Sequence, residues 1–152
     1  MSREFKHSSA RFSDDRVYRY RLGRRWGDNL AIVTWLMLNP SIADEVCLDP
    51  TIRRCVGFSE SWGWKGKPLF GGIEVVNLFG LVSTNPKKLL VHPDPVGPEN
   101  DAAIMEAASV SKLIICAFGD LKREAMRQRA VRICRELSRS HELHVLSVTQ
   151  RG

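Results

Sequence analysis

The chain has 152 residues, the length of one domain, since folded domains typically contain about 100 to 200 residues. Apolar residues make up 43% of the chain and charged residues 26%, which is ordinary globular composition and excludes a disordered polymer or a fibrous repeat. The 23 Lys and Arg residues outnumber the 17 Asp and Glu residues. The resulting net charge of +6 favours an anionic partner such as DNA or a nucleotide.

The sequence predicts neither a metal site nor a membrane segment. Its four cysteines have no CxxC spacing and its four histidines form no HxH or HxxxH pair, so we expect no metal and no cofactor. No apolar run approaches the roughly 18 residues that cross a bilayer, and the first residues lack an apolar signal segment. We therefore expect a cytoplasmic protein without membrane contact, with a flexible segment at 1–15 and one α/β domain at 16–152.

The predicted elements alternate between strands and helices along most of the chain. In chain order, the patterns predict an edge strand at 17–22 with a turn at 23–28, a strand at 30–38, a helix at 50–62, a strand at 73–79, a short helix ending at 90, a helix at 99–111, a strand at 112–118, a helix at 121–139 and a strand at 144–148. Such alternation indicates a three-layer α/β/α sandwich around a mainly parallel sheet of about four strands, with an N-terminal antiparallel hairpin at one edge.

Two local sequence patterns are the main support for this predicted architecture. Residues 30–38 form a nearly continuous apolar run, which is typical of a central strand covered on both faces. Asp49 and Pro50 combine a residue that caps helices with a proline at the first helical position, so a helix should begin there.

Small or amide-bearing residues follow the predicted strands at their carboxyl ends. Asn39 follows the first central strand, Asn77 lies near the end of the second, Gly119 follows the third and 149–150 follow the last. Parallel sheets bind ligands at this edge, because loops and helix N-termini surround a crevice there. Amides both donate and accept hydrogen bonds, so the sequence predicts a pocket for a polar ligand such as a nucleobase.

Each of the two asparagines has two interpretations. Pro40 limits Asn39 to extended backbone, which either directs its side chain into the crevice or forms an Asx turn that caps 41–44. Asn77 lies in an apolar strand, where an unpaired buried amide costs about 1–3 kcal/mol. Its partner is therefore either a backbone group or a ligand.

Acidic residues near the crevice are further candidates. Asp44 and Asp49 flank the loop after the first central strand, where either can act as a general base or bind a cation. Asp49 is better explained as a helix cap, which leaves Asp44 as the catalytic candidate. Asn100 and Asp101 begin a helix beside a proline-rich loop, where they either cap the helix or contact a substrate.

Aromatic and basic residues after the first helix are candidates for nucleic-acid binding. Trp62 and Trp64 alternate with Lys65 and Lys67 on a glycine-flanked segment. Such residues can stack on bases and contact phosphates, or the tryptophans can pack against the core at the helix end.

Two other regions are rich in basic residues. Arg24 and Arg25, with Arg19 and Arg21 nearby, form a candidate basic patch on the predicted hairpin. The basic residues of 122–139 spread over more than one helix face, which favours a solvated helix over a stripe dedicated to DNA.

Five segments of the chain resemble the bacterial and phage family known as domain of unknown function 1643. They are M-L-N-P-S-I-A-D at 37–44, D-P-T-I-R-R-C at 49–55, V-V-N-L-F-G at 75–80, D-P-V-G-P-E-N-D at 94–101 and A-F-G-D at 117–120. The resemblance spans about residues 17–152 and implies no particular activity. That family usually continues past the final strand with a His-Pro segment, so the resemblance predicts that a piece of the site is missing from a chain ending at 152.

L-N-P-S at 38–41 is also similar, more distantly, to the uracil-DNA glycosylase superfamily, whose mismatch-specific members carry Asn-Pro after the first central strand. The resemblance implies a glycosylase-like fold and hydrolysis of an N-glycosidic bond after a nucleotide is flipped out. It implies that Asn39, with or without Asp44, orients the attacking water and that Asn77 reads the base. Phe118 and Gly119 resemble the aromatic-glycine pair that ends a strand in that superfamily.

The site expected from the sequence therefore has catalytic and substrate-binding members. Asn39 and Asp44 are the catalytic candidates, and the substrate-binding candidates are Pro40, Ser41, Asn77, Asn100, Asp101, Phe118 and Gly119. Ser41 stands where the glycosylase superfamily more usually has glycine.

Two other function classes remain open. One is a non-catalytic nucleic-acid-binding module, and the other is an enzyme or sensor that acts on a free nucleotide or nucleoside in the same crevice. The chain contains neither GxxxxGK[ST] nor GxGxxG after a strand, which disfavours a P-loop kinase and a Rossmann dehydrogenase.

Overall fold

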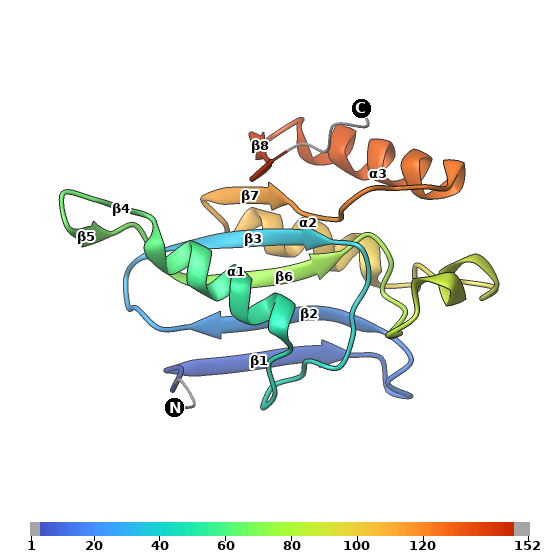
Figure 1. The fold of residues 1–152 in the computed structure, drawn as a ribbon, viewed down its shortest axis with the longest axis horizontal. Coiled ribbons are helices and arrows are strands. Elements are labelled where there is room, and N and C mark those ends of the chain that lie inside the picture. The colour runs from blue at the N-terminus through green and yellow to red at the C-terminus, as the bar shows by residue number, and fades with distance from the viewer. Residues whose placement is uncertain (1–3, 148–152) are drawn as a thin grey trace.

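The computed structural model describes residues 4–147, which form a six-stranded sheet, a separate two-stranded hairpin and helices on both sheet faces (Figure 1). The sheet contains β1 (His7–Phe12), β2 (Arg19–Arg25), β3 (Ala31–Met37), β6 (Phe70–Asn77), β7 (Leu113–Cys116) and β8 (Leu143–His144), and the hairpin contains β4 (Gly63–Trp64) and β5 (Lys67–Pro68). The helices are α1 (Pro50–Ser61), the 3-10 helix η1 (Pro86–Leu90), α2 (Asn100–Ser109) and α3 (Glu124–Leu137).

The strands lie in the order β1-β2-β6-β3-β7-β8. Strands β6, β3, β7 and β8 are parallel, whereas β2 is antiparallel to β6 and β1 is antiparallel to β2. Helix α1 connects β3 to β6, α2 connects β6 to β7, and α3 connects β7 to β8. The prediction of an α/β protein with a mainly parallel sheet and an antiparallel edge is confirmed.

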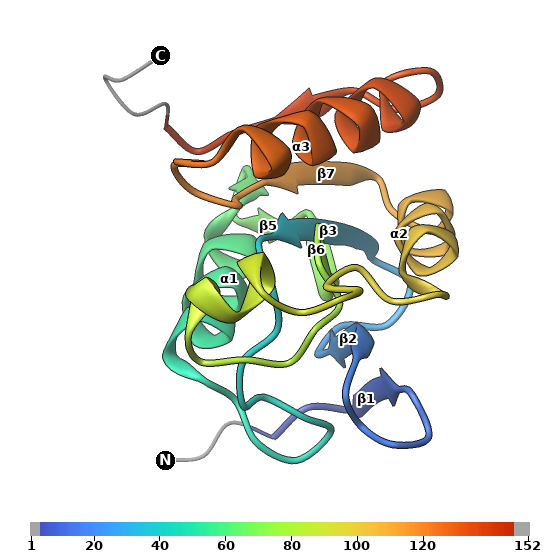
Figure 2. The same ribbon diagram turned by 90° about the vertical axis from the view of Figure 1, so that its right-hand side faces the viewer.

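A hydrophobic cluster covers each face of the sheet. On one face, Trp35 of β3 packs in a cluster with Ile52 of α1. On the other face, Leu36 packs in a cluster with Ile104 of α2 and Ile133 of α3. Figure 2 shows α1 and α2 on opposite sides of the strands. Because successive side chains of a strand point to opposite faces, β3 must be apolar at nearly every position.

Residues 7–12 form strand β1, where the sequence predicts a flexible segment. The strand has the sequence HSSARF, and its residues alternate between exposed and half-buried. It pairs with β2 from His7 opposite Arg25 to Phe12 opposite Arg19. Backbone hydrogen bonds of this kind need no apolar stripe, so hydrophobic patterning misses the strand. The expected turn at 23–28 also begins later, because β2 continues to Arg25.

The hairpin of β4 and β5 is a second element that the sequence does not predict. Lys65 and Gly66, both with positive φ, form its two-residue turn. The predicted helix at 50–62 is confirmed as α1, whereas α3 begins at Glu124 rather than 121. Part of the predicted strand at 144–148 and residues 149–150 lie outside the described residues. Within residues 4–147, no helix has the length and apolar character that crossing a membrane requires.

Candidate functional site at the carboxyl edge of the sheet

A pocket of about 150 Å³ lies where β3, β6 and β7 end, beside the first turn of α1; Figure 2 looks onto this edge of the sheet. Its polar lining consists of Arg19, Asn39, Ser41, Asp49, Thr51 and Asn77. Three of the residues expected at the crevice, Asn39, Ser41 and Asn77, are therefore brought together in one cavity. Pro40, by contrast, is buried beside the pocket, and its carbonyl oxygen accepts from the backbone N–H of Ser83 at 2.9 Å.

Asn77 occupies the last position of β6 and is 1% exposed. Its Nδ2 is buried and has no hydrogen-bond partner within residues 4–147. The sequence leaves open whether this amide bonds to a backbone group or to a ligand. The described residues supply no backbone partner for its nitrogen. A buried amide donor without a partner costs about 1–3 kcal/mol, and a ligand in the pocket would supply the missing acceptor.

The side-chain amide of Asn39 is held in one orientation by three backbone carbonyls. Its Nδ2 donates to Ser83 at 2.8 Å, to Pro40 at 3.1 Å and to Leu81 at 3.4 Å. These bonds fasten the segment after β6 to the end of β3. Because the nitrogen is used in this way, Oδ1 is the atom of Asn39 that can accept a hydrogen bond from water or a ligand.

Asp49 caps α1 and also lines the pocket. One carboxylate oxygen, Oδ1, accepts from the backbone N–H of Ile52 at 2.8 Å, and Pro50 occupies the first helical position. The carboxylate is largely buried, with Asp49 7% exposed, and Oδ2 accepts no hydrogen bond from the described residues. Thr51 in the first turn of α1 lines the same cavity, so the N-terminal end of this helix adjoins it.

Asp44 does not line the pocket. Its carboxylate accepts from the backbone N–H groups of Cys47 at 2.7 Å and Val46 at 2.8 Å, and these bonds hold its pKa below the usual value. The residue closes the turn at 44–47 in the loop between β3 and α1. The carboxylate beside the ligand space is Asp49, not the Asp44 expected from the sequence.

The arginines expected to form a basic patch are engaged within the protein. Arg24 is 1% exposed, and its guanidinium donates to the backbone carbonyls of Gly23, Ser9, Asp44 and Cys47. Burial lowers its pKa. Arg25 donates to Glu74 at 2.6 Å and is half-buried. These side chains hold β2 to its neighbours, so they do not form the exposed patch that the sequence suggests.

Asn100 and Asp101 lie behind the strand end, on the face opposite α1. Asn100 Nδ2 donates to the backbone carbonyls of Asn77 at 2.9 Å and Leu78 at 3.2 Å. Asp101 pairs with Arg129 at 2.6 Å and Arg132 at 2.8 Å. Partial burial raises the pKa of Asp101, but the two arginines outweigh it and hold the pKa below its usual value. Asn100 therefore supports the backbone of Asn77 from outside the pocket, while Asp101 connects α2 to α3.

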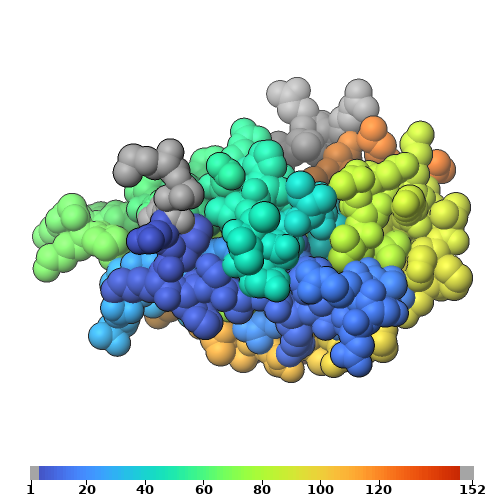
Figure 3. Space-filling model, turned by 90° about the horizontal axis from the view of Figure 1, so that it is seen from below, coloured from blue at the N-terminus to red at the C-terminus, as the bar shows by residue number. Residues whose placement is uncertain are grey.

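The two tryptophans have different environments. Trp62 is half-buried and stacks on Trp35, with ring centroids 6.0 Å apart and 12° between the planes. Trp64 is 69% exposed and lies on the hairpin with Lys65 and Lys67. The hairpin leads directly into the start of β6, so it projects from the amino end of the sheet (Figures 1 and 3). The pocket lies at the opposite end.

Ala117, rather than Phe118, lines the pocket after β7. Phe118 is half-buried and packs against the cluster on the face of α2 and α3. Gly119 is exposed and has a φ of 76°, which glycine adopts readily at the turn that ends the strand.

The sequence places Asp49 near the crevice but favours a role in helix capping, and it does not place Arg19 or Thr51 in the pocket. Asp49 and Thr51 could have been assigned there, because the N-terminus of a helix that follows a parallel strand faces this edge. Arg19 has no such signal in the sequence. Its Nη1 donates to the carbonyl of Ala43 at 2.6 Å, and burial lowers its pKa to about 10.

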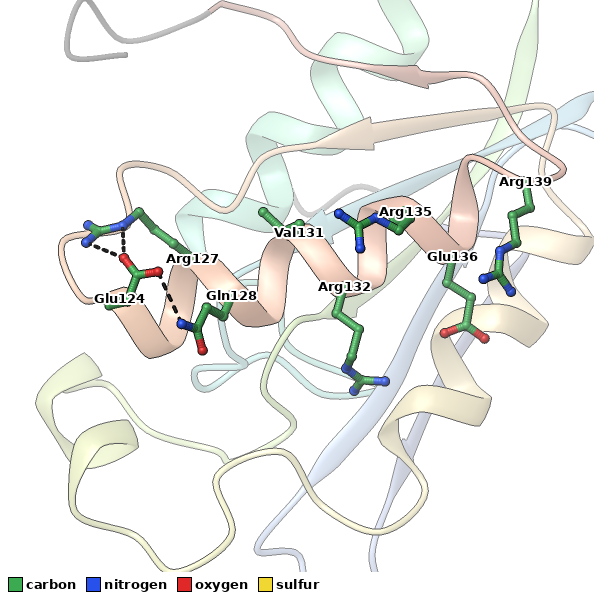
Figure 4. Close-up of a pocket in the computed structure, with 8 residues that line it drawn as sticks. All are labelled: Glu124, Arg127, Gln128, Val131, Arg132, Arg135, Glu136 and Arg139. Carbon is green, nitrogen blue, oxygen red and sulfur yellow. Dashed lines mark hydrogen bonds and ion pairs between the residues drawn. The ribbon is translucent and has the colours of Figure 1, made fainter.

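A wider hollow of about 690 Å³ runs along the outer face of α3. Figure 4 shows that its labelled residues come from this helix and, for Arg139, from the turn that follows it. Arg127 pairs with Glu124 at 2.9 Å, and Arg132 pairs with Asp101 of α2. The hollow is therefore the solvated face of an amphipathic helix. Within the described part of the chain, no group of three or more His, Cys, Asp or Glu residues is arranged to hold a metal ion.

Comparison with known proteins places the chain in a family. No curated protein and no solved structure gives a significant match. A family model described as protein of unknown function DUF1643 matches residues 19–152, which is nearly the whole chain. The chain therefore belongs to the DUF1643 family.

Proposed function

We propose that this protein binds a nucleobase in the strand-end pocket and hydrolyses the N-glycosidic bond between that base and its sugar. The observation that carries the proposal is the buried Nδ2 of Asn77, which lines the pocket and has no partner within residues 4–147. A nucleobase edge presents carbonyl oxygens and ring nitrogens that accept from such a donor. Binding a base would therefore relieve the cost of the unpaired amide.

The size of the pocket supports a base rather than a whole nucleotide. Pockets that enclose drug-sized ligands usually measure about 300–1,000 Å³. This pocket measures about 150 Å³. A single ring can enter it while the sugar and phosphate stay outside, which is the arrangement of a nucleotide flipped out of a nucleic acid.

Asn39 and Asp49 can activate the water. Asn39 Oδ1 accepts a hydrogen bond from the water, and Asp49 Oδ2 accepts its proton as the water oxygen bonds to the sugar carbon. The bond from that carbon to the base nitrogen breaks, and its electron pair leaves with the base. The base then takes up the proton held by Asp49, so the products are a free base and a sugar hydroxyl.

The order of the parts along the chain also supports the proposal. Asn39-Pro40 after β3, Asn77 at the end of β6 and Phe118-Gly119 after β7 follow the order of the similar motifs in the uracil-DNA glycosylase superfamily. Phe118 packs into the core, so a base in this pocket would not stack on it.

The test is a base-release screen. Single-stranded oligonucleotides, duplexes and free nucleosides, each carrying one common or deaminated base, are incubated with the protein. Released base is measured by chromatography, and abasic sites are measured by alkaline strand cleavage. We expect release from at least one base in an oligonucleotide.

Three substitutions test which residues bind the base and activate the water. Asn77→Leu removes the unpartnered donor at similar volume, so base release should disappear while the free energy of unfolding stays equal or rises by about 1 kcal/mol. Asp49→Asn keeps a good helix cap and removes the charge, so release should slow by about 100-fold or more. Asp44→Asn is the matched control outside the pocket, and it should leave release unchanged.

Other outcomes of these experiments would contradict a part of the proposal. Release by the Asn77→Leu variant at the wild-type rate would contradict the placement of the base. Release from free nucleosides alone would assign the pocket to a small-molecule enzyme. Oligonucleotide binding without release from any substrate would leave a non-catalytic binding module and overturn the hydrolysis.

A further inference from the structure

A bulge in β2 turns Arg19 toward the pocket. In the pairing of β1 with β2, Arg11 lies opposite Arg21 and Phe12 lies opposite Arg19, so Tyr20 is an extra residue without a partner in the ladder. Side chains on the two sides of such a bulge no longer follow a simple alternation.

The bulge reverses the face on which Arg19 lies. In a regular strand Arg19 would share a face with Arg21, which pairs with Glu106 of α2. Instead, Arg19 lies on the face of α1, where it reaches the carbonyl of Ala43 and lines the pocket. Bulges beside ligand sites commonly serve to re-aim one side chain in this way.

The guanidinium of Arg19 is buried without an ionic partner. Arg19 is 2% exposed, its Nε has no hydrogen-bond partner, and no carboxylate of residues 4–147 lies within ion-pairing distance. Burial lowers its pKa to about 10, with Arg24 also lowering it and Asp49 and Asp44 raising it, so the group stays protonated at neutral pH. A buried charge without a directly paired group is costly, and an anionic group of a ligand in the pocket would lower that cost.

Two residues of the pocket lining, Arg19 and Asn77, thus each carry a buried donor without a partner, Nε and Nδ2 respectively. They come from neighbouring strands, since β2 pairs with β6 and the backbone N–H of Arg19 donates to Gly80 just beyond the end of β6. The carboxylate of Asp49 belongs to the same lining. The lining of the pocket therefore combines two residues with unpartnered donors, one of them cationic, with an anionic acceptor.

We propose that Arg19 is a catalytic residue that stabilises the negative charge on the departing base. This inference rests on the hydrolysis proposed above. When the bond between sugar carbon and base nitrogen breaks, the electron pair spreads over the ring nitrogens and carbonyl oxygens of the base. Asn39 and Asn77 are neutral and cannot balance this charge, whereas Arg19 is a preorganised cation in a site shielded from water. The proton from the attacking water, held by Asp49, then neutralises the released base.

The test measures how the rate depends on the base as a leaving group. The most readily released pyrimidine base of the screen is compared with its 5-fluoro analogue, which forms its anion more easily. Arg19 compensates for a poor leaving group, so the 5-fluoro substitution should accelerate wild-type release only slightly. In Arg19→Gln the acceleration should be at least about tenfold larger, and kcat for the unsubstituted base should fall by about 100-fold or more.

Arg19→Lys and Arg21→Gln complete the design. The lysine variant keeps the cation, so its leaving-group dependence should stay close to that of the wild type even if its rate falls. If the glutamine variant does not fold, the lysine variant still tests the role of the cation. Arg21→Gln removes a charge from the other face of β2 and should change neither kcat nor the 5-fluoro effect. Circular dichroism and thermal melting of each variant verify the fold.

The two proposals fail in different ways. If the wild type releases base but Arg19→Gln keeps the wild-type kcat and 5-fluoro effect, the role of Arg19 is overturned and the hydrolysis stands. If kcat falls equally for both bases, Arg19 has a structural role only. If the wild type releases no base, the hydrolysis and the role of Arg19 are both overturned.

Discussion

Residues of the same type have opposite roles in this protein according to where the fold puts them. Arg24 is buried and satisfied by four backbone carbonyls, whereas the buried Arg19 leaves Nε without a partner. Trp62 stacks on Trp35 inside a hydrophobic cluster, whereas Trp64 extends into solvent. The partner of a side chain, and not its type, distinguishes a structural residue from one available to a ligand.

The tryptophan pair gives a prediction at this scale. Trp62→Ala should lower the free energy of unfolding by about 3 kcal/mol, because it removes a large ring packed against the core. Trp64→Ala should change it by less than about 0.5 kcal/mol, because that ring is exposed. Urea unfolding followed by tryptophan fluorescence and circular dichroism measures both. Equal losses from the two substitutions would contradict the assignment of Trp62 to the core.

At the scale of elements, α2 and α3 are fastened to the end of β6. Asn100 of α2 donates to the carbonyls of Asn77 and Leu78, and Arg129 Nε of α3 donates to Leu78 at 2.8 Å. Arg129 also pairs with Asp101, so the two helices and the strand end form one connected set of contacts. This set holds the backbone that presents Asn77 to the pocket.

The Asp101 contacts predict how stability depends on pH. The pKa of Asp101 in the folded protein is lower than its ordinary value of 3.8, so the folded state favours the ionised carboxylate. Its contribution is fully present above the unfolded pKa near 4 and is lost as the pH falls through the folded pKa. Asp101→Asn should therefore be less stable than the wild type at pH 7, and the difference should shrink toward pH 3.

Urea midpoints measured from pH 7 to pH 3 check this prediction. Asp120→Asn is the matched control, because Asp120 is exposed and makes no ion pair with any of residues 4–147. A difference between wild type and Asp101→Asn that stays constant across this range would show that the ion pairs with α3 do not stabilise the fold.

At the scale of the whole molecule, exposed positive charge occurs at both ends of the sheet. Lys65 and Lys67 lie on the hairpin at the amino end, while Lys122 and Arg123 lie between β7 and α3 at the carboxyl end. Figures 1 and 3 show the hairpin projecting from the molecule, with the segment around η1 at the opposite end. A nucleic acid whose base enters the pocket would pass over the carboxyl end.

These two pairs of basic residues allow a matched comparison of the two ends of the sheet. The double variants Lys122→Gln/Arg123→Gln and Lys65→Gln/Lys67→Gln each lower the net charge from +6 to +4, a change of two in both. The first should weaken binding to a labelled oligonucleotide and reduce the salt slope by about 1 for each phosphate that the variant no longer neutralises. The second should bind like the wild type. Fluorescence anisotropy at about 50 and about 200 mM salt measures both.

Other results would contradict binding of the nucleic acid at the carboxyl end of the sheet. Weaker binding by the hairpin variant alone would place the nucleic acid at the amino end of the sheet, near Trp64, and separate it from the pocket. Equal weakening by both variants would indicate attraction to net charge without a defined path.

The sequence by itself determined the features that depend on local pattern. The apolar run of β3 predicts a strand buried on both faces, and Asp49-Pro50 predicts the start of α1. Alternation of strands and helices then predicts a parallel sheet, and a parallel sheet brings Asn39 and Asn77 to one edge. These predictions succeed because hydrophobic periodicity, capping and crossover handedness act over a few residues or one connection.

Only the tertiary structure decided which side chains are free to act. Strand β1 forms by pairing with β2, and the bulge in that pairing turns Arg19 to the pocket. The amide of Asn39 is oriented by the neighbouring carbonyl of Pro40 and by two carbonyls more than 40 residues away, whereas the amide nitrogen of Asn77 finds no partner in the described chain. Whether a polar group is satisfied depends on atoms that distant segments bring to it, so no local pattern of residues contains that information.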